Sequence, residues 1–396
     1  MAKSNIIYLD YSASVSPNPS SIHAFGMEAK KNLENARREV AGVLGARPFE
    51  IIFTSGGTES NNLAIQGVVL KFWELSSQVG AELPKLPHIV TTNIEHPSVL
   101  ETFKLMEKRK LAQISIVPVE KNGIIDPKKI KQAIKKNTIL VSVMYANNEI
   151  GTIQPIKEIA KVIRHYNKEN AKPFRVFFHT DAVQAVNYLD LNVEKLGVDL
   201  LSLSGTKIEG AGRVGVLYKK STVLLANVYG GGNQELGLRP GTENLPEILK
   251  FSQALGSIQK TKEKEVKRLT GLRNYFINKL ATNSAIAENK VILNGDLKDR
   301  LPNNVNVTFP NIPSDLLVIE LSAKGIMASA KSACQSGESG ASYVIQALHN
   351  KVGLPAGALA EEGGVRFSFG RQTTKKDIDY TVKTLSEILQ KLKKWY

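Results

Sequence analysis

The sequence predicts an α/β fold in which helices cover both faces of a mostly parallel, seven-stranded sheet. Short apolar runs recur along the first half of the chain, and amphipathic helical patterns fall between several of them. This alternation is typical of β–α units, whose parallel strands are buried on both faces and therefore apolar throughout. The seven runs are Ile51–Phe53, His88–Thr91, Ile114–Val117, Thr138–Val143, Val176–His179, Leu200–Ser204 and Val214–Tyr218.

Helices are assigned from the spacing of apolar residues. The first helix carries them every three or four residues, at Ala29, Leu33, Ala36, Val40 and Leu44. That spacing places them on one face of a helix. A second helix is expected from about Asn61, after a glycine-rich loop, and a third includes Ile156–Ile163.

The pattern changes around Phe251, where a long amphipathic helix begins. That helix carries Ile258, Val266, Leu269, Tyr275, Phe276 and Leu280, and further short strands are expected at Ile6–Leu9, Val305–Phe309, Gly325–Ala328 and Val365–Ser368. Thr374–Asp377 resembles a capping box that opens a last helix. We therefore expect a large domain over residues 14–251 and a smaller α+β domain that combines residues 1–13 and 252–396.

Composition and charge narrow the class of protein. With 42% apolar and 22% charged residues, the 396-residue chain has the composition of a soluble globular protein. No apolar run is long enough to span a bilayer and no signal-like segment opens the sequence, so we expect a cytoplasmic protein without a membrane partner. The formal net charge of +15 is spread along helix faces such as Lys260–Arg268 and Lys375–Lys394. That distribution favours a solvated surface over direct binding of nucleic acid or of an acidic protein.

Cys334 is the one cysteine of the chain, which excludes an intrachain disulfide and a multi-cysteine metal site. The six histidines show no metal-ligand spacing, so no metal is expected. A lone cysteine is either an inert side chain or a nucleophile, and composition alone does not decide between them.

The stretch Leu201–Lys207 takes an apolar strand into small and hydroxyl residues and ends it on a lysine. Burial disfavours the charged form of a lysine unless the amine pairs or forms a covalent bond. A Schiff base with the aldehyde of pyridoxal phosphate (PLP) requires such a placement. The alternative is a lysine that marks the end of a strand at the surface.

Two glycine-rich stretches differ in their context. Thr54–Asn62 lies between a strand and a helix, where glycines, the helix N-terminus and the Thr58 hydroxyl suit an anion. It has no P-loop lysine, which argues against a nucleoside triphosphate. Gly210–Gly215 matches the dinucleotide pattern but precedes a strand, so we set a nucleotide-dependent dehydrogenase aside.

Two further side chains follow predicted strands. Asp181 ends an apolar strand, and a buried carboxylate needs a positive partner, which a pyridinium nitrogen supplies. His96 follows another strand and is able to stack on a ring and move protons. A capping aspartate and a structural histidine are the alternatives.

Taken together, these motifs resemble those of the cysteine desulfurases, PLP enzymes of the class V aminotransferase group with fold type I. The matching stretches are Tyr8–Asp10, Asn18–His23, Phe53–Asn62, Glu95–His96, Asn147–Gly151, Asp181–Gln184, Ser204–Lys207, Leu238–Asn244, Ser332–Cys334 and Arg366–Ser368. They run nearly from end to end and occur in the family's order.

The resemblance implies that residues 14–251 form the PLP-binding domain. Lys207 would hold PLP covalently, Asp181 would pair with its pyridinium nitrogen, and His96 would stack on its ring. The remaining cofactor contacts would be Gly57, Thr58, Ser204 and Thr206 at the phosphate and Asn148 and Gln184 near the phenolic oxygen. Thr242 would reach the phosphate from the other subunit of a homodimer.

The resemblance also implies a substrate and a nucleophile. Arg366 would bind the carboxylate of L-cysteine bidentately, with Asn148 beside it. Cys334, in a loop of the smaller domain, would attack the substrate sulfur as a thiolate and become a persulfide. The expected catalytic residues are therefore Lys207, His96 and Cys334.

The chain departs from the family pattern at three places. Thr206 stands where the family usually has a histidine, which removes a proton-transfer group but keeps a donor for phosphate. Between Asp10 and Asn18 the chain is shorter by about a helix and its flanks. Lys331 replaces a glycine shortly before the cysteine.

The expected function is conversion of L-cysteine to L-alanine, with transfer of the persulfide sulfur to an acceptor of iron–sulfur cluster assembly or tRNA thiolation. One alternative is a related PLP lyase that acts on selenocysteine or another β-substituted amino acid. Another is a catalytically weak relative that serves as a scaffold for sulfur-handling partners.

Overall fold

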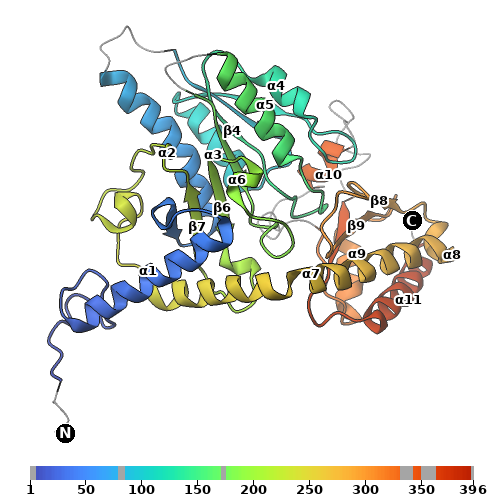
Figure 1. The fold of residues 1–396 in the computed structure, drawn as a ribbon. Helices are drawn as coiled ribbons and strands as arrows, with labels where there is room; N and C mark the ends of the chain where they lie inside the picture. Colours follow the sequence, from blue (N-terminus) through green and yellow to red (C-terminus); the bar gives the residue numbers. More distant parts are fainter. Residues whose placement is uncertain (1–5, 79–84, 171–174, 331–341, 349–362, 394–396) are drawn as a thin grey trace.

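A central sheet flanked by helices dominates the computed structural model (Figure 1), which describes residues 6–78, 85–170, 175–330, 342–348 and 363–393. Its strands are β1 (Ile51–Thr54), β2 (His88–Thr92), β3 (Gln113–Val117), β4 (Thr138–Ser142), β5 (Phe177–Asp181), β6 (Leu200–Ser204), β7 (Gly215–Lys219), β8 (Ile292–Leu293), β9 (Asn304–Thr308) and β10 (Gly364–Ser368). Its helices are α1 (Ala24–Leu44), α2 (Gly57–Gln78), α3 (Pro97–Lys108), α4 (Pro127–Ala133), α5 (Ile156–Glu169), α6 (Val193–Leu196), α7 (Leu245–Thr282), α8 (Ser284–Ala287), α9 (Ser314–Ala323), α10 (Tyr343–Leu348) and α11 (Lys375–Leu392). Short 3₁₀ turns are η1 (Pro48–Glu50), η2 (Gly205–Lys207) and η3 (Gln234–Gly237). None of the described helices is both long and apolar enough to cross a membrane.

In the described part of the chain, the large sheet has the strand order β1-β7-β6-β5-β4-β2-β3. Strands β6, β5, β4, β2 and β3 pair in parallel, and β7 is antiparallel to both of its neighbours. The predicted α/β fold with a mostly parallel seven-stranded sheet is therefore confirmed. Each predicted run agrees with its strand to within two residues at either end.

Alternate residues of the strands pack into two separate cores. Ile51 and Phe53 of β1 face the core that contains residues of α1, α5 and the first part of α7. Ile52, between them, faces the core formed with α2 and α3. This alternation is what the two-residue period of a strand requires when both faces are covered.

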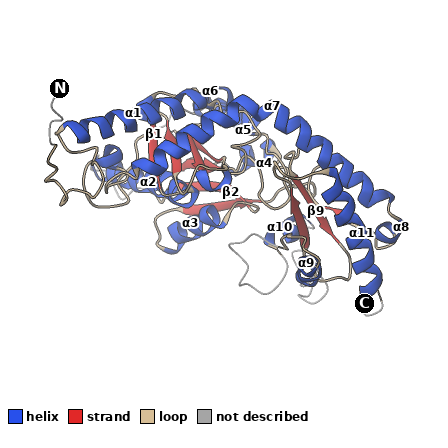
Figure 2. Ribbon diagram, turned by 90° about the horizontal axis from the view of Figure 1, so that it is seen from below, coloured by secondary structure: helices blue, strands red, loops and turns tan. Residues whose placement is uncertain are grey.

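A second sheet, with the antiparallel order β10-β9-β8, packs against α9, α11 and the last part of α7. Helix α7 is 38 residues long and joins both cores, because Ile258 packs with the large sheet and Leu269 with the small one. Figures 1 and 2 show α7 lying beside α1 along the large sheet and continuing to the small one. The domain boundary predicted at residues 251–252 falls inside this helix, and the division into two domains stays a prediction.

Local expectations differed from the structure at three places. Helix α2 begins at Gly57 rather than near Asn61, since the two glycines allow the chain to turn directly after β1. Gly325–Ala328 is not a strand, because Gly325 adopts φ +78° where the chain leaves α9, and only Ser329 bridges to β10. Ile6–Leu9 pairs with no strand among the described residues, and residues 6–13 lie at the far end of α1 from the small sheet (Figures 1 and 2).

The last helix begins where the sequence predicts. Thr374 accepts from the backbone N–H of Asp377, and the Asp377 carboxylate accepts from the N–H of Thr374, at 3.3 and 2.8 Å. These two bonds form the capping box and satisfy donors that a helix N-terminus leaves unpaired.

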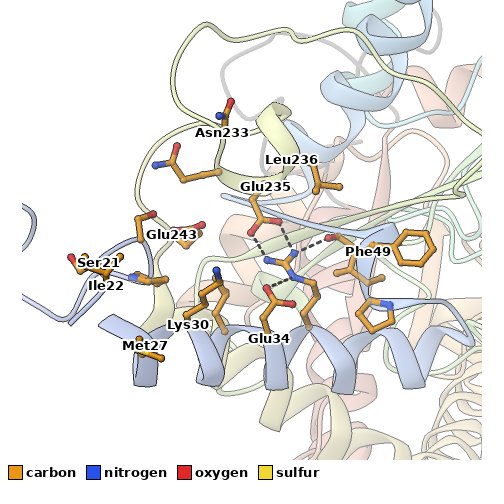
Figure 3. Close-up of a pocket in the computed structure, with 17 residues that line it drawn as sticks. Ser21, Ile22, Met27, Lys30, Glu34, Phe49, Asn233, Glu235, Leu236 and Glu243 are labelled. Carbon is orange, nitrogen blue, oxygen red and sulfur yellow. Dashed lines mark hydrogen bonds and ion pairs between the residues drawn. The ribbon is translucent and has the colours of Figure 1, made fainter. Parts of the chain in front are cut away.

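A buried ion pair attaches the segment after β7 to the edge of the sheet. Arg37 of α1 donates to both carboxylate oxygens of Glu235, at 2.8 and 2.7 Å (Figure 3). Arg37 also donates to the carbonyl of Ile51, and the N–H of Phe53 donates to Glu235, both at 2.8 Å. Glu235 and Leu236 have φ of 46° and 62°, which is unfavourable for residues with a side chain. The ion pair holds the backbone in this conformation.

We expect Glu235→Gln to lower the free energy of unfolding by about 2 kcal/mol, because it removes the carboxylate that binds the buried guanidinium of Arg37 through two hydrogen bonds and leaves Glu34, at 3.2 Å, as its ion-pair partner. Urea denaturation followed by circular dichroism measures the change. The control is Glu74→Gln, which removes the partner of Lys71 in a partly exposed ion pair and should cost less than about 0.5 kcal/mol. Equal effects of the two substitutions would contradict the role of the buried pair.

Candidate active site

The carboxyl ends of neighbouring strands bring several predicted site residues together. Asp181 ends β5 and pairs in register with Ser202 of β6. Ser204 and the turn that ends at Lys207 follow directly on β6. The loop after β1 opens α2 at Gly57 on the same side. In open parallel sheets this edge is where ligands bind.

A cavity of about 240 Å³ lies at this edge. Its lining includes ten of the predicted site residues, namely Gly57, Thr58, His96, Asn148, Asp181, Gln184, Ser204, Thr206, Lys207 and Arg366. They come from both sheets, since Arg366 lies in β10. The structure therefore gathers in one place residues that the sequence spreads over 310 positions, from 57 to 366.

Sequence reasoning missed four further lining residues, which are Asn61, Ser98, Met144 and Val183. Two of these residues could have been predicted from their spacing in the sequence. Asn61 lies one helical turn after Gly57, and Ser98 lies in the first turn of α3 behind His96. Residues four apart in a helix share a face, so the spacing within α2 pointed toward the cavity.

The first turn of α2 suits an anion. Gly57 and Thr58 begin this 22-residue helix, so backbone N–H groups without helical acceptors lie at the cavity. A Cβ atom on Gly57 would lie 2.7 Å from Cγ2 of Val183, which leaves no room for another residue. The hydroxyls of Ser204 and Thr206, 2.9 Å apart, add donors to the same wall.

The carboxylate of Asp181 is held by two donors. Its Oδ1 accepts from the backbone N–H of Val183 at 3.0 Å, and its Oδ2 accepts from Nδ2 of Asn61 at 2.7 Å. The residue is 5% exposed, so these bonds replace water and fix the orientation of the carboxylate.

His96 is the N-cap of α3. Its Nδ1 accepts from the backbone N–H of Ser98 at 3.1 Å and lies 2.8 Å from the hydroxyl of the same residue. Burial lowers the pKa of His96, while the charge of Asp181 opposes this shift and that of Lys207 adds to it. Burial therefore favours the neutral form of the imidazole.

Arg366 connects the small sheet to the cavity. Its Nη1 donates to the carbonyl of Asn148 at 2.9 Å, and its backbone N–H donates to the carbonyl of Ser329 at 2.7 Å. Burial lowers the pKa of the guanidinium, and the nearby Glu149 opposes that shift. A guanidinium stays charged at any pH of interest and matches a carboxylate bidentately.

Pyridoxal phosphate fits these residues. Lys207 offers an amine for a Schiff base, Asp181 a carboxylate for the pyridinium nitrogen, and the start of α2 a site for the phosphate. In addition, Oδ1 of Asn148 is buried without a hydrogen-bond partner in the described part of the chain. Buried polar atoms are rarely left unpaired, so a donor from a bound group would complete this wall.

Two predicted site residues are not among the described residues that line this cavity. Thr242 is exposed, on the segment that follows η3. Cys334 lies outside the described residues. The roles of both therefore stay predictions.

Comparison with known proteins gives one consistent result. The family model described as "Aminotransferase class-V" matches residues 2–381. A curated relative from Dictyoglomus turgidum, named cysteine desulfurase IscS, is 41% identical over 376 residues, which are 95% of this chain and 88% of the relative.

Two solved structures agree with this assignment. One described as a NifS-like protein has a TM-score of 0.80 and 32% identity, and the match covers 94% of this chain and 91% of that one. Another, SspA in complex with cysteine, has a TM-score of 0.69 and 31% identity, with 89% and 90% covered. The chain therefore belongs to the class V aminotransferases, a PLP-dependent family, and within them to the cysteine desulfurases.

Proposed function

We propose that this protein is a cysteine desulfurase, which converts L-cysteine to L-alanine and keeps the sulfur as a persulfide on Cys334. The observation that carries the proposal is that Lys207, Asp181 and Arg366 line one cavity. An amine, a buried carboxylate and a guanidinium are the groups that a PLP enzyme needs for cofactor and amino-acid substrate. The relatives named cysteine desulfurase, and the neighbour solved with cysteine, support the choice of substrate.

Each cavity residue has a task in this reaction. When bound, PLP supplies an electron sink that weakens bonds at the substrate α-carbon. The first turn of α2, with Ser204 and Thr206, binds the phosphate, and Asp181 keeps the pyridinium nitrogen protonated. Arg366 orients the substrate carboxylate beside Asn148. Lys207, once its amine is free, moves a proton at the α-carbon.

Two other residues complete the cofactor contacts that we propose. His96 would stack on the ring, and burial, which lowers the pKa of its imidazole, favours the neutral form there. Gln184 lies at the same cavity and would donate to the phenolic oxygen together with Asn148.

The sulfur step balances without an added oxidant. The Cys334 thiolate attacks the substrate sulfur and forms a sulfur–sulfur bond, while the substrate carbon–sulfur bond breaks and its electron pair stays on carbon. Protonation of that carbon gives alanine. The persulfide then passes its outer sulfur to an acceptor protein, which we propose to be an iron–sulfur scaffold or a tRNA-thiolation carrier in the cytoplasm.

We also propose a homodimer whose subunits complete each other's sites. Exposed apolar side chains, together with charged ones such as Lys30 and Glu243, line a cavity of about 910 Å³ beside the segment that carries Thr242 (Figure 3). The apolar side chains are Ile22, Met27, Phe49 and Leu236. Exposed apolar patches are uncommon on monomers. A second copy that covers the patch would bring Thr242 to the phosphate site of its partner.

Lys207→Ala should abolish the covalent bond to PLP, because no other amine is proposed to reach the aldehyde. Borohydride reduction followed by peptide mass analysis measures the adduct. Lys219→Ala is the matched control, since Lys219 also ends a strand next to β6 but does not line the cavity, and it should keep the adduct. A reducible adduct in the Lys207 variant would refute the assignment.

Cys334→Ser should slow alanine release from L-cysteine by about two orders of magnitude or more, because a hydroxyl is a far weaker nucleophile than a thiolate. The cavity residues remain, so the variant should still show a change in cofactor absorbance when L-cysteine is added. Alanine formation at the wild-type rate would instead favour a lyase that needs no protein thiol.

Thr242→Ala should weaken PLP binding through the partner's site, and a mixed dimer tests this directly. Co-expression of Lys207→Ala and Thr242→Ala subunits with different tags gives a dimer in which one cavity has both Lys207 and the partner's threonine. That dimer should bind one PLP as tightly as wild type. If Thr242 acted within its own subunit, no cavity would be complete and tight binding would be lost.

A further inference from the structure

A line of hydrogen bonds joins Asp181 to His96 through two side chains that the motifs did not assign. Nδ2 of Asn61 donates to Oδ2 of Asp181 at 2.7 Å and to Oγ of Ser98 at 2.9 Å. Oγ of Ser98 lies 2.8 Å from Nδ1 of His96. Asn61 and Ser98 are buried, with 1% and 9% of their surface exposed, so water does not compete for these bonds.

The direction of each bond follows from the donors and acceptors present. A carboxylate only accepts, so the amide nitrogen of Asn61, and not its oxygen, faces Asp181. The amide nitrogen only donates, so Oγ of Ser98 accepts its second hydrogen. The one proton of that hydroxyl is then left for Nδ1 of His96.

Helix capping imposes the same direction. As the N-cap of α3, His96 accepts the backbone N–H of Ser98 at Nδ1, at 3.1 Å. Two donors therefore converge on Nδ1, which leaves no position for a proton on that atom. A neutral imidazole must then carry its proton on Nε2.

We propose that Asn61 and Ser98 are positioning residues that hold His96 as its Nε2-protonated tautomer and tie its ring to the carboxylate of Asp181. A histidine held in this way donates a hydrogen bond from Nε2 and cannot accept a proton there. The two residues thus fix the ring and its proton before substrate binds, as outer hydrogen-bond partners do for metal-bound histidines. The consequence for turnover rests on the proposed desulfurase function, whereas the assignment of the tautomer rests on the hydrogen bonds alone.

Solid-state ¹⁵N NMR of the holoenzyme, labelled at Nδ1 of histidine, tests the tautomer. The signal of His96 is identified by its loss in His96→Gln. In the wild type it should be that of an unprotonated ring nitrogen. Ser98→Ala removes one of the two donors while the backbone N–H remains, so the signal of the unprotonated Nδ1 should shift, and Ser98→Thr, which keeps the hydroxyl, should restore the wild-type signal.

A second serine–histidine contact provides the control. His179 is buried between Ser142 and Ser202, at 2.8 and 3.0 Å, and does not line the cavity. Ser202→Ala should change the signal of His179 and leave that of His96 unchanged. A protonated Nδ1 of His96 in the wild type, or an unchanged signal in Ser98→Ala, would overturn the proposal.

Kinetics then measure the consequence for turnover. Ser98→Ala should lower kcat about tenfold, the effect of one buried hydrogen bond, with KM for L-cysteine nearly unchanged because Arg366 and Asn148 are intact. Asn61→Leu also removes the donor to Oδ2 of Asp181, so alone it should lower kcat more than Ser98→Ala does, and the double variant should lose less than the two single losses combined, since both residues act through the same line of bonds. Additive losses in the free energy of activation would mean that the two residues act separately, which would contradict their action through one line of hydrogen bonds. Should the wild type release no alanine while Nδ1 is unprotonated, the desulfurase function fails and the positioning role stands.

Discussion

Asp181 carries a carboxylate that is 5% exposed, and taking an ion out of water costs several kcal/mol unless polar partners replace the solvent. The end of β5 supplies one partner, the N–H of Val183, and the first turns of α2 supply another, Asn61. Because Asn61 belongs to α2, its bond to Asp181 places the start of this helix, with Gly57 and Thr58, beside the turn after β6 that ends at Lys207. The cavity thus depends on how one buried charge is satisfied.

The electrostatics around this carboxylate keep it the dominant negative group. Glu95 precedes His96 and is fully buried, and burial raises the pKa of its carboxyl to about 8. Its Oε1 accepts from Thr92 and from the N–H of Met144, at 2.7 and 2.9 Å. A largely protonated Glu95 leaves Asp181 as the carboxylate that we propose to pair with the ring nitrogen of PLP.

The sequence predicted the sheet well because β–α repetition leaves a strong local pattern. Strand ends that meet at one edge pointed to Lys207, Asp181 and Gly57, whereas the other predicted cavity residues, such as Asn148 and Arg366, came from the resemblance to the cysteine desulfurases. It could not predict contacts between distant segments. Asn61 and Asp181 are 120 positions apart, and Arg37 and Glu235 are 198 apart. Such pairs leave no periodic signal.

Ile6–Leu9 was wrongly predicted as a strand because β propensity does not reveal whether a neighbouring strand is present. The structure of one chain does not test the prediction for Thr242, since its proposed contact is with the phosphate site of another subunit.

The central claim is that the sulfur of L-cysteine is transferred to this chain's own cysteine while alanine is released. Intact-protein mass spectrometry after L-cysteine is added to the holoenzyme, without an acceptor or reductant, tests it most directly when alanine is counted in the same sample. Since Cys334 is the one cysteine, the account predicts one added sulfur atom per subunit, one alanine per added sulfur, and loss of that mass on reduction. Release of alanine with no gain of protein mass would contradict it.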